Sequence, residues 1–74
     1  MKKVNAVETG RRIRLYMVNR GISSDELALK LNYSDRTTIS RWTRGKSIPS
    51  YENLVNMAEV LDCRPDDLVI MDEE

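Results

Sequence analysis

The sequence predicts an all-α fold built from five short helices. Apolar residues recur at helical spacing in several segments, and capping or turn-forming residues separate these segments from one another. The chain has 74 residues, of which 41% are hydrophobic and 32% charged, a composition typical of one small globular domain. We therefore expect a single domain over 1–74, with its core at about 9–70 and short tails at 1–4 and 71–74, and we find no alternation typical of strands.

A first helix is expected over residues 6–20. Asn5 can cap its amino end, and Gly21 can adopt the left-handed conformation that ends it. Four residues on one side form its predicted core face: Thr9, Ile13, Tyr16 and Met17. Three apolar residues lie on the opposite side: Val7, Leu15 and Val18. They either form a patch that docks a second subunit or another protein, or are scattered apolar residues of an ordinary surface.

Local signals at amino ends place three further helices. A capping box at 23–26 opens a second helix that continues through Leu31. Ser50 caps a fourth helix over about 51–61. Pro65 suits the first position of a short fifth helix.

The third helix is expected over about 36–44. Ser34 or Asp35 can cap it, and it ends at Gly45. Ile39 and Trp42 are its apolar pair, so we expect the Trp42 ring to pack in the core rather than to stack on a base. The other positions carry Arg, Thr or Ser, side chains that suit phosphates and base edges.

The charges are divided between the two halves of the chain. The formal net charge is zero, but residues 1–46 hold eleven Lys or Arg and four acids, whereas residues 47–74 hold only Arg64 against eight acids. This asymmetry predicts a basic working face for a polyanion and an acidic end turned away from it. The alternative is ordinary solvated surface charge.

Catalytic and membrane functions have little support in the composition. A single cysteine, Cys63, and the absence of histidine exclude an internal disulfide, a four-ligand zinc site and a nucleophile paired with histidine. Cys63 itself is expected to be a small buried apolar side chain. The longest apolar runs have four residues, and no apolar segment typical of a signal peptide follows the first lysines. We therefore expect no enzyme, catalytic residue, metal site, cofactor or membrane span.

Helix, short turn and cationic helix together favour DNA binding. An α-helix fits the major groove of DNA, which is about 12 Å wide. Arginine can donate two bonds to guanine there, and Thr or Ser can contact base edges, while Lys and Arg neutralise phosphates. The second and third predicted helices thus form a candidate helix-turn-helix motif.

At these positions the sequence resembles the Cro and lambda-repressor (XRE-type) family of helix-turn-helix DNA-binding domains. The similarity runs from about Thr9 to Val69. It is carried by the following stretches: Gly10-Arg-Arg-Ile-Arg14, Gly21-Ile-Ser23, Glu26-Leu-Ala28, Thr38-Ile-Ser-Arg-Trp42, Arg44-Gly-Lys46, Pro49-Ser50, Asn53-Leu54, Ala58 and Asp67-Leu68. The resemblance implies a five-helix, lambda-repressor-like fold and a small transcriptional regulator, a repressor, that binds operators as a dimer.

The resemblance also implies roles for individual residues. The expected base contacts come from the third helix: Arg36, Thr37, Thr38, Ser40 and Arg41. The expected phosphate contacts flank it: Arg12, Ser24, Arg44, Gly45 and Lys46. Arg14 is as good a candidate as Arg12, and both are equally compatible with ordinary exposed positions on a helix.

Two departures from the family pattern affect this assignment. The turn over 32–35 looks one residue longer than is common, which shifts the placement of Arg36 and Thr37 by up to one position. Many members also have Arg where this chain has Met17, and Glu where it has Thr43. The loss of both partners together replaces an ion pair with a methionine contact and leaves no lone buried charge.

The expected partner is double-stranded DNA, bound by a homodimer, with no small-molecule ligand or membrane partner. The family resemblance implies a cytoplasmic, nucleoid-associated protein of bacterial or phage origin. The alternative is a protein-interaction module, such as an antitoxin or adaptor, in which DNA binding is secondary or lost. The apolar side of the first helix and the acidic end of the chain, 66–74, favour that alternative.

Overall fold

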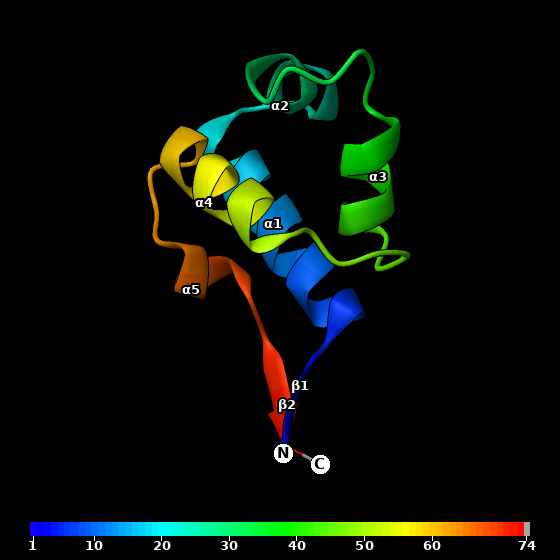
Figure 1. The fold of residues 1–74 in the computed structure, drawn as a ribbon. Coiled ribbons are helices and arrows are strands. Elements are labelled where there is room, and N and C mark those ends of the chain that lie inside the picture. Colours follow the sequence, from blue (N-terminus) through cyan, green and yellow to red (C-terminus); the bar gives the residue numbers. More distant parts are fainter. Residues whose placement is uncertain (74) are drawn as a thin grey trace.

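The computed structural model describes residues 1–73 and confirms the predicted all-α fold with five helices (Figure 1). The helices are α1 (Ala6–Arg20), α2 (Ser24–Lys30), α3 (Thr37–Thr43), α4 (Tyr51–Val60) and α5 (Pro65–Leu68). Two short strands, β1 (Lys2–Val4) and β2 (Met71–Glu73), lie at the two ends of the chain. The predicted helix bounds agree with these to within about one residue.

Local capping explains why the helices begin where they do. The Glu8 amide donates to Asn5 Oδ1 (2.9 Å) at the start of α1, and the Asn53 amide donates to Ser50 Oγ (3.2 Å) at the start of α4. The predicted capping box of α2 is complete, because the side chains of Ser23 and Glu26 each accept from the other's backbone amide.

Residues in the left-handed conformation follow four of the helices, α1 to α4, and the sequence predicts two of them, Gly21 after α1 and Gly45 after α3. Gly21 follows α1 with φ 67°, and Asn32 follows α2 with φ 65°. In α5, Pro65 occupies the first turn, and the Arg64 amide donates to Asp67 Oδ2 (2.9 Å). These breaks let successive helices turn back on one another and enclose a common core.

The core lies between the five helices and consists of apolar side chains from each of them. Six of these side chains are completely buried: Ile13, Leu27, Ile39, Met57, Leu61 and Leu68. On α1, Thr9, Ile13 and Met17 are buried and Tyr16 packs against them, which confirms the predicted core face. Cys63 is only partly buried at the edge of the core. None of the helices within residues 1–73 has the length and apolar character of a membrane span.

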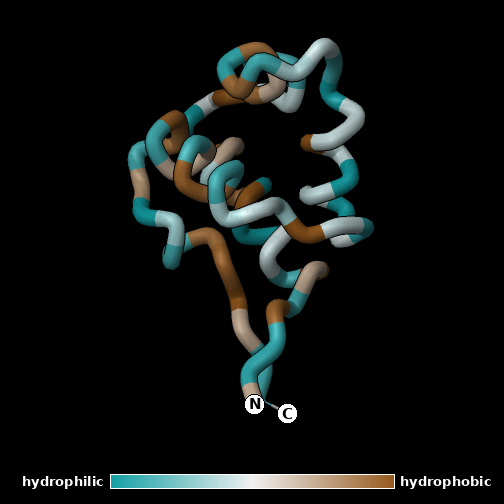
Figure 2. The backbone as a smooth tube through the Cα atoms, in the orientation of Figure 1, coloured by the Kyte–Doolittle hydropathy of each residue, from teal (hydrophilic) through white to brown (hydrophobic). Residues whose placement is uncertain are grey.

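The segments expected to be short tails, 1–4 and 71–74, contain two strands that the sequence analysis did not predict. β1 and β2 pair antiparallel, with Lys2 opposite Glu73 and Lys3 opposite Asp72, and they project together from the helical body (Figure 1). Figure 2 shows the hydrophobic stretch that leads from α5 toward β2. Each strand has only three residues, too few for an alternation that a sequence pattern could reveal. Glu74 lies outside the described residues.

A buried hydroxyl fastens the C-terminal segment to α1. Thr9 Oγ1, which is almost completely buried, accepts from the Ile70 amide (3.0 Å). The Asn5 amide donates to the Ile70 carbonyl oxygen (2.8 Å), and Asn5 Nδ2 donates to Asp72 Oδ2 (2.8 Å). The start of α1 therefore holds the end of the chain in place.

Candidate nucleic-acid interface

The inner and outer faces of α3 have opposite chemistry. Ile39 is completely buried and Trp42 is 4% exposed, which confirms that both belong to the core. Because each helical residue advances by about 100°, the opposite face carries Thr37 and Arg41, with the C-cap residue Arg44 at its end, and all three are exposed. Thr38 and Ser40 flank this face and are partly buried. The exposed face of α3 therefore presents two guanidinium groups and a hydroxyl to solvent.

Contacts with two neighbouring segments hold α3 in position, and one of these segments is itself bonded to α4. A Cβ on Gly10 of α1 would overlap the Trp42 carbonyl oxygen, so α1 and α3 approach as closely as backbone allows. The Tyr33 and Trp42 rings meet edge to face, with centroids 6.0 Å apart and an interplanar angle of 76°. The Tyr33 hydroxyl in turn donates to Asn53 Oδ1 of α4 (3.2 Å). The exposed face of α3 is thus presented by a rigid support.

The start of α3 lies one residue later than the sequence indicates. The first residue of α3 is Thr37, one position after the expected start at about 36, and Asp35 Oδ1 accepts from the Thr37 amide (2.9 Å). The hydrogen bonds from the Thr37 backbone and side chain lower the pKa of the Asp35 carboxyl. Arg36 precedes the helix, and its Nη1 lies 3.8 Å from Asp25 Oδ2 of α2. Arg36 therefore stands at the rim of the face rather than at its centre.

Backbone groups after α3 are already bonded within the domain. The Gly45 amide donates to the Trp42 carbonyl oxygen (3.1 Å), and the Lys46 amide donates to that of Arg41 (2.8 Å). Gly45 has φ 72° and lies so close to Val7 that a Cβ would contact the Val7 Cα at 2.9 Å. In this segment only the exposed side chains of Arg44 and Lys46 are available to an external anion.

The other two predicted phosphate contacts lie on different sides of the domain. Arg12 is turned toward α5, where its Nη1 donates to the Asp67 carbonyl oxygen (3.2 Å). Ser24 is the first residue of α2 and lies near the end of α3, because it lines the same hollow as Thr43. The structure brings Ser24 close to α3 and directs Arg12 away from it.

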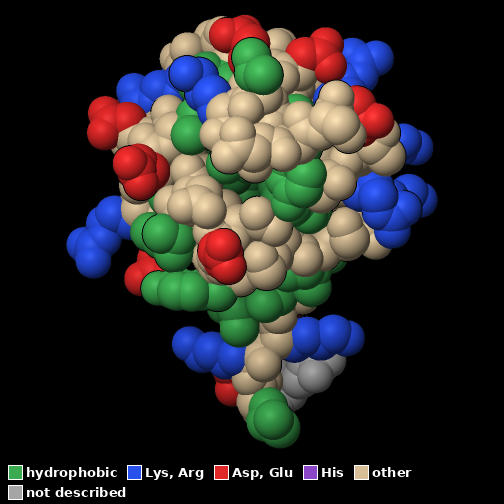
Figure 3. Space-filling model, turned by 45° about the horizontal axis from the view of Figure 1, so that its top comes forward, with side chains coloured by type: hydrophobic (Ala, Val, Ile, Leu, Met, Phe, Trp, Pro, Cys, Tyr) green, Lys and Arg blue, Asp and Glu red, His purple; other side chains and the backbone are tan. Residues whose placement is uncertain are grey.

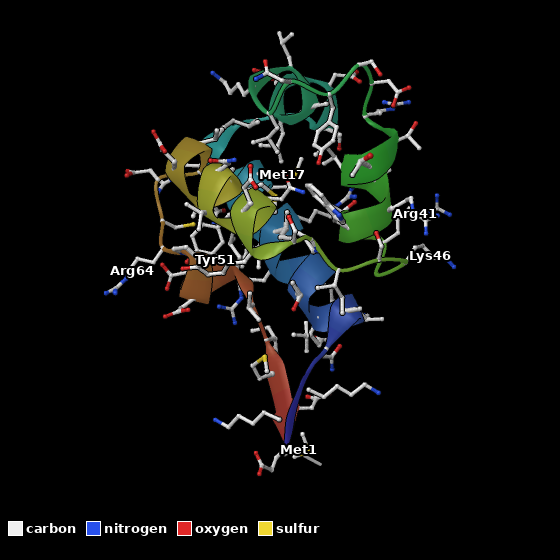
Figure 4. The ribbon with its side chains drawn as sticks, viewed as in Figure 1. Met1, Met17, Arg41, Lys46, Tyr51 and Arg64 are labelled. Carbon is white, nitrogen blue, oxygen red and sulfur yellow. The ribbon has the colours of Figure 1, made fainter. Side chains whose placement is uncertain are left out.

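Cationic side chains mark one edge of the molecule. Figure 4 shows Arg41 and Lys46 projecting from the side of α3, whereas Arg64 and Tyr51 lie across the domain from them. Figure 3 shows Lys and Arg side chains at this edge, and others on the opposite side and near the base of the molecule. Within residues 1–73, no group of three or more Cys, Asp or Glu side chains is arranged to hold a metal ion. The site is therefore an exposed cationic surface, suited to a polyanion.

One positioning residue has no assigned role in the sequence analysis. Gly10 lies inside α1, where glycine weakens a helix by about 1 kcal/mol relative to alanine. A glycine inside a helical pattern usually has a packing reason, and that signal could have located the contact between α1 and α3.

This fold and this surface define the class of helix-turn-helix proteins, and comparison with known proteins agrees. The model of the helix-turn-helix family matches residues 11–68, most of the chain. The chain therefore belongs to the helix-turn-helix family, and its predicted resemblance to XRE-type, lambda-repressor-like domains is confirmed. The comparison with curated protein sequences gave no match.

Three solved structures illustrate the similarity. The restriction-modification controller protein C.AhdI from Aeromonas hydrophila is 30% identical, with a TM-score of 0.79 over 86% of this chain and 91% of that one. The P22 c2 repressor, solved in complex with a synthetic operator, is 32% identical, with a TM-score of 0.74 over 81% and 89%. The biofilm master regulator SinR, solved in complex with DNA, is 31% identical, with a TM-score of 0.74 over 81% and 95%.

Proposed function

We propose that this protein is a transcriptional regulator that binds double-stranded DNA in a sequence-specific manner. The exposed face of α3 carries the proposal, because Thr37 and Arg41 lie together on a helix whose other side is anchored in the core, and Arg44 caps its carboxyl end beside them. A helix presented in this way fits the major groove. Two related domains, those of the P22 c2 repressor and SinR, were solved in complex with DNA.

The proposed base contacts centre on Thr37 and Arg41. Both residues lie on the exposed face of α3, and Arg41 can donate two hydrogen bonds to a guanine. Arg36, Thr38 and Ser40 lie beside them and complete the proposed base-reading set.

The proposed phosphate contacts are Ser24, Arg44 and Lys46. Their side chains flank the exposed face of α3. Each phosphate that Arg44 or Lys46 neutralises makes the affinity for DNA fall more steeply as the salt concentration rises. The remaining two predicted contacts have less support. Arg12 is bonded to α5, and the Gly45 amide is bonded to Trp42.

We further propose that two copies bind together as a repressor dimer, without an enzymatic activity, a cofactor or a small-molecule ligand. One α3 covers only a few base pairs, and a two-fold dimer reads half-sites about 34 Å apart on one side of the duplex. We also propose that the protein acts in the cytoplasm, on the nucleoid, as is expected for a regulator of bacterial or phage origin.

A second candidate function is a protein-interaction module. Val7, Leu15 and Val18 on α1 are 51%, 53% and 68% exposed, and an open hollow of about 280 Å³ lies beside Leu15 and Val18. These side chains offer a partner protein an apolar surface, as an adaptor would need. A function of this kind would leave the cationic face of α3 without a role.

Selection of duplexes from a random pool tests the proposal. We expect an enriched palindrome, and a mobility shift with that duplex that weakens steeply as salt increases. A scrambled duplex of the same length and composition is the control, and it should bind more weakly. The absence of any shift at low salt, on selected and random duplexes alike, would favour the interaction module.

A further inference from the structure

Three arginines lie within four residues of α1, and the structure gives each a different environment. Arg11, Arg12 and Arg14 have the same side chain, but successive residues of a helix point about 100° apart. Arg12 and Arg14 therefore point to nearly opposite sides of α1. Sequence alone cannot rank them as DNA contacts.

Arg11 and Arg12 are engaged within the domain. Arg11 Nη1 lies 3.3 Å from Glu8 Oε2, one turn earlier on the same helix. Arg12 Nη1 donates to the Asp67 carbonyl oxygen (3.2 Å), and its side chain is partly buried against α5. Binding of an external phosphate by either residue would compete with these contacts.

The Arg14 side chain is exposed and makes no ion pair or hydrogen bond with any residue in 1–73. It lines a hollow of about 190 Å³ where α1 meets the start of α2 and the end of α3. The hollow has an apolar lining of Met17, Val18 and Ile22 and a polar one of Ser23, Ser24 and Thr43. No acidic residue lines it, so nothing in its wall opposes an anion.

Two of the three hydroxyls in this hollow are already committed. Ser23 Oγ accepts from the Glu26 amide (3.1 Å) as the cap of α2, and Thr43 Oγ1 donates to the Ser40 carbonyl oxygen (3.2 Å). The Ser24 hydroxyl makes no side-chain hydrogen bond with the described residues. The guanidinium of Arg14 and the hydroxyl of Ser24 therefore have no side-chain partner among the described residues, and both can donate to a ligand.

We propose that Arg14 and Ser24 together bind one backbone phosphate of the duplex whose major groove α3 occupies. The inference rests on the proposed function, since it places the phosphate beside α3. A guanidinium and a hydroxyl are suitable donors for a phosphodiester, which accepts charge-assisted hydrogen bonds from arginine. Arg14, rather than Arg12, is thus the contribution of α1 to DNA binding.

The salt dependence of DNA affinity in three matched variants tests this assignment. Arg11→Ala, Arg12→Ala and Arg14→Ala remove the same charge from neighbouring positions of one helix. We expect Arg14→Ala to weaken binding to selected and random duplexes by the same factor and to reduce the salt slope by about 0.9, the value of one phosphate contact. Arg11→Ala should leave the salt slope unchanged. Arg12→Ala should also leave it unchanged, provided that thermal melting shows the variant to be folded.

A second measurement locates the phosphate. In this measurement each backbone phosphate of the selected duplex is replaced in turn by an uncharged methylphosphonate. At one position the replacement should weaken DNA binding by the wild type but cause no further loss of affinity in Arg14→Ala. The affinity of Ser24→Ala should be insensitive to replacement at that same position. If the ligand is the duplex backbone, inorganic phosphate at millimolar concentration should not compete with DNA for this hollow. Competition by inorganic phosphate that is lost in Arg14→Ala and Ser24→Ala would instead assign the hollow to the free anion.

The two proposals fail in different ways. If the wild type binds DNA but Arg14→Ala behaves like Arg11→Ala, the assignment of Arg14 is overturned and the proposed function stands. If the wild type binds no duplex at low salt, the proposed function is overturned and the assignment of Arg14 falls with it. The Arg14 side chain is exposed and makes no hydrogen bond or ion pair within residues 1–73, so Arg14→Ala should melt at nearly the same temperature as the wild type.

Discussion

Gly10 of α1 lies directly against the backbone carbonyl of Trp42 in α3. A Cβ at residue 10 would overlap that carbonyl oxygen and would lie 2.9 Å from the carbonyl oxygen of Thr43. The last turn of α3 therefore rests on the backbone of α1 with no side chain between them. This contact fixes how far the cationic face of α3 stands from the body.

Gly10→Ala should destabilise the domain by about 1 to 3 kcal/mol, because backbone atoms cannot yield as a flexible side chain can. Urea unfolding measures the change. Gly21→Ala is the matched control: it has open space around the new Cβ, and its left-handed backbone should cost only about 1 kcal/mol. A smaller loss for Gly10→Ala than for Gly21→Ala would contradict the close packing of α1 and α3.

Met17→Arg should destabilise the domain by about 1 to 3 kcal/mol, because it places an unpaired cation at a site that is 4% exposed. Met17 and Thr43 line the same hollow, so Thr43→Glu can supply a partner for that cation. In a double-mutant cycle the two changes together should cost less than their sum. Additive losses in chemical denaturation would show that residues 17 and 43 do not meet.

Arg41→Ala should weaken binding to the selected duplex by about 1 to 3 kcal/mol and relax discrimination at one base pair. Lys46→Ala is the comparison, because its side chain is also exposed but lies beyond the end of α3. It should weaken binding to all duplexes alike. Titration of the selected duplex and single-base variants measures both. An equal loss on every duplex for Arg41→Ala would assign Arg41 to the phosphate backbone.

Thr9→Val should destabilise the domain by about 1 to 3 kcal/mol, because it leaves the Ile70 amide without its hydroxyl acceptor. Hydrogen exchange at Ile70 should become faster, since the C-terminal strand is held there. Thr9→Ser keeps the acceptor and should preserve slow exchange. Unchanged exchange at Ile70 in Thr9→Val would mean that the Asn5 contacts alone retain β2.

The charge of Asp35 should stabilise the domain in a pH-dependent way. Hydrogen bonds from Thr37 lower the pKa of this carboxyl in the folded state, so its contribution is present above the ordinary aspartate pKa of about 4. It is lost as the pH falls through the lowered value. Asp35→Asn keeps the acceptor and removes the charge. The melting temperature of the wild type should exceed that of Asp35→Asn at pH 6, and the difference should shrink below about pH 4; a difference independent of pH would exclude this origin.

Local signals in the sequence determined most of the helical framework. Asn5, Ser23 and Ser50 cap helices through groups three residues away, and Gly21 ends α1 through its own backbone angle. Such interactions depend on neighbours in the chain, so sequence spacing is enough to predict them. The burial of Ile39 and Trp42 was predictable in the same way, because they are the only large apolar side chains of α3 and lie on one side of it.

Only the tertiary structure decided features that join distant parts of the chain. The pairing of β1 with β2 and the bond between Thr9 and Ile70 link residues more than 60 positions apart, and three-residue strands leave no periodic pattern. The different environments of Arg12 and Arg14 depend on which helices pack against each side of α1. Sequence determines which residues a helix carries on each side, but the packing of the other helices determines what each side meets.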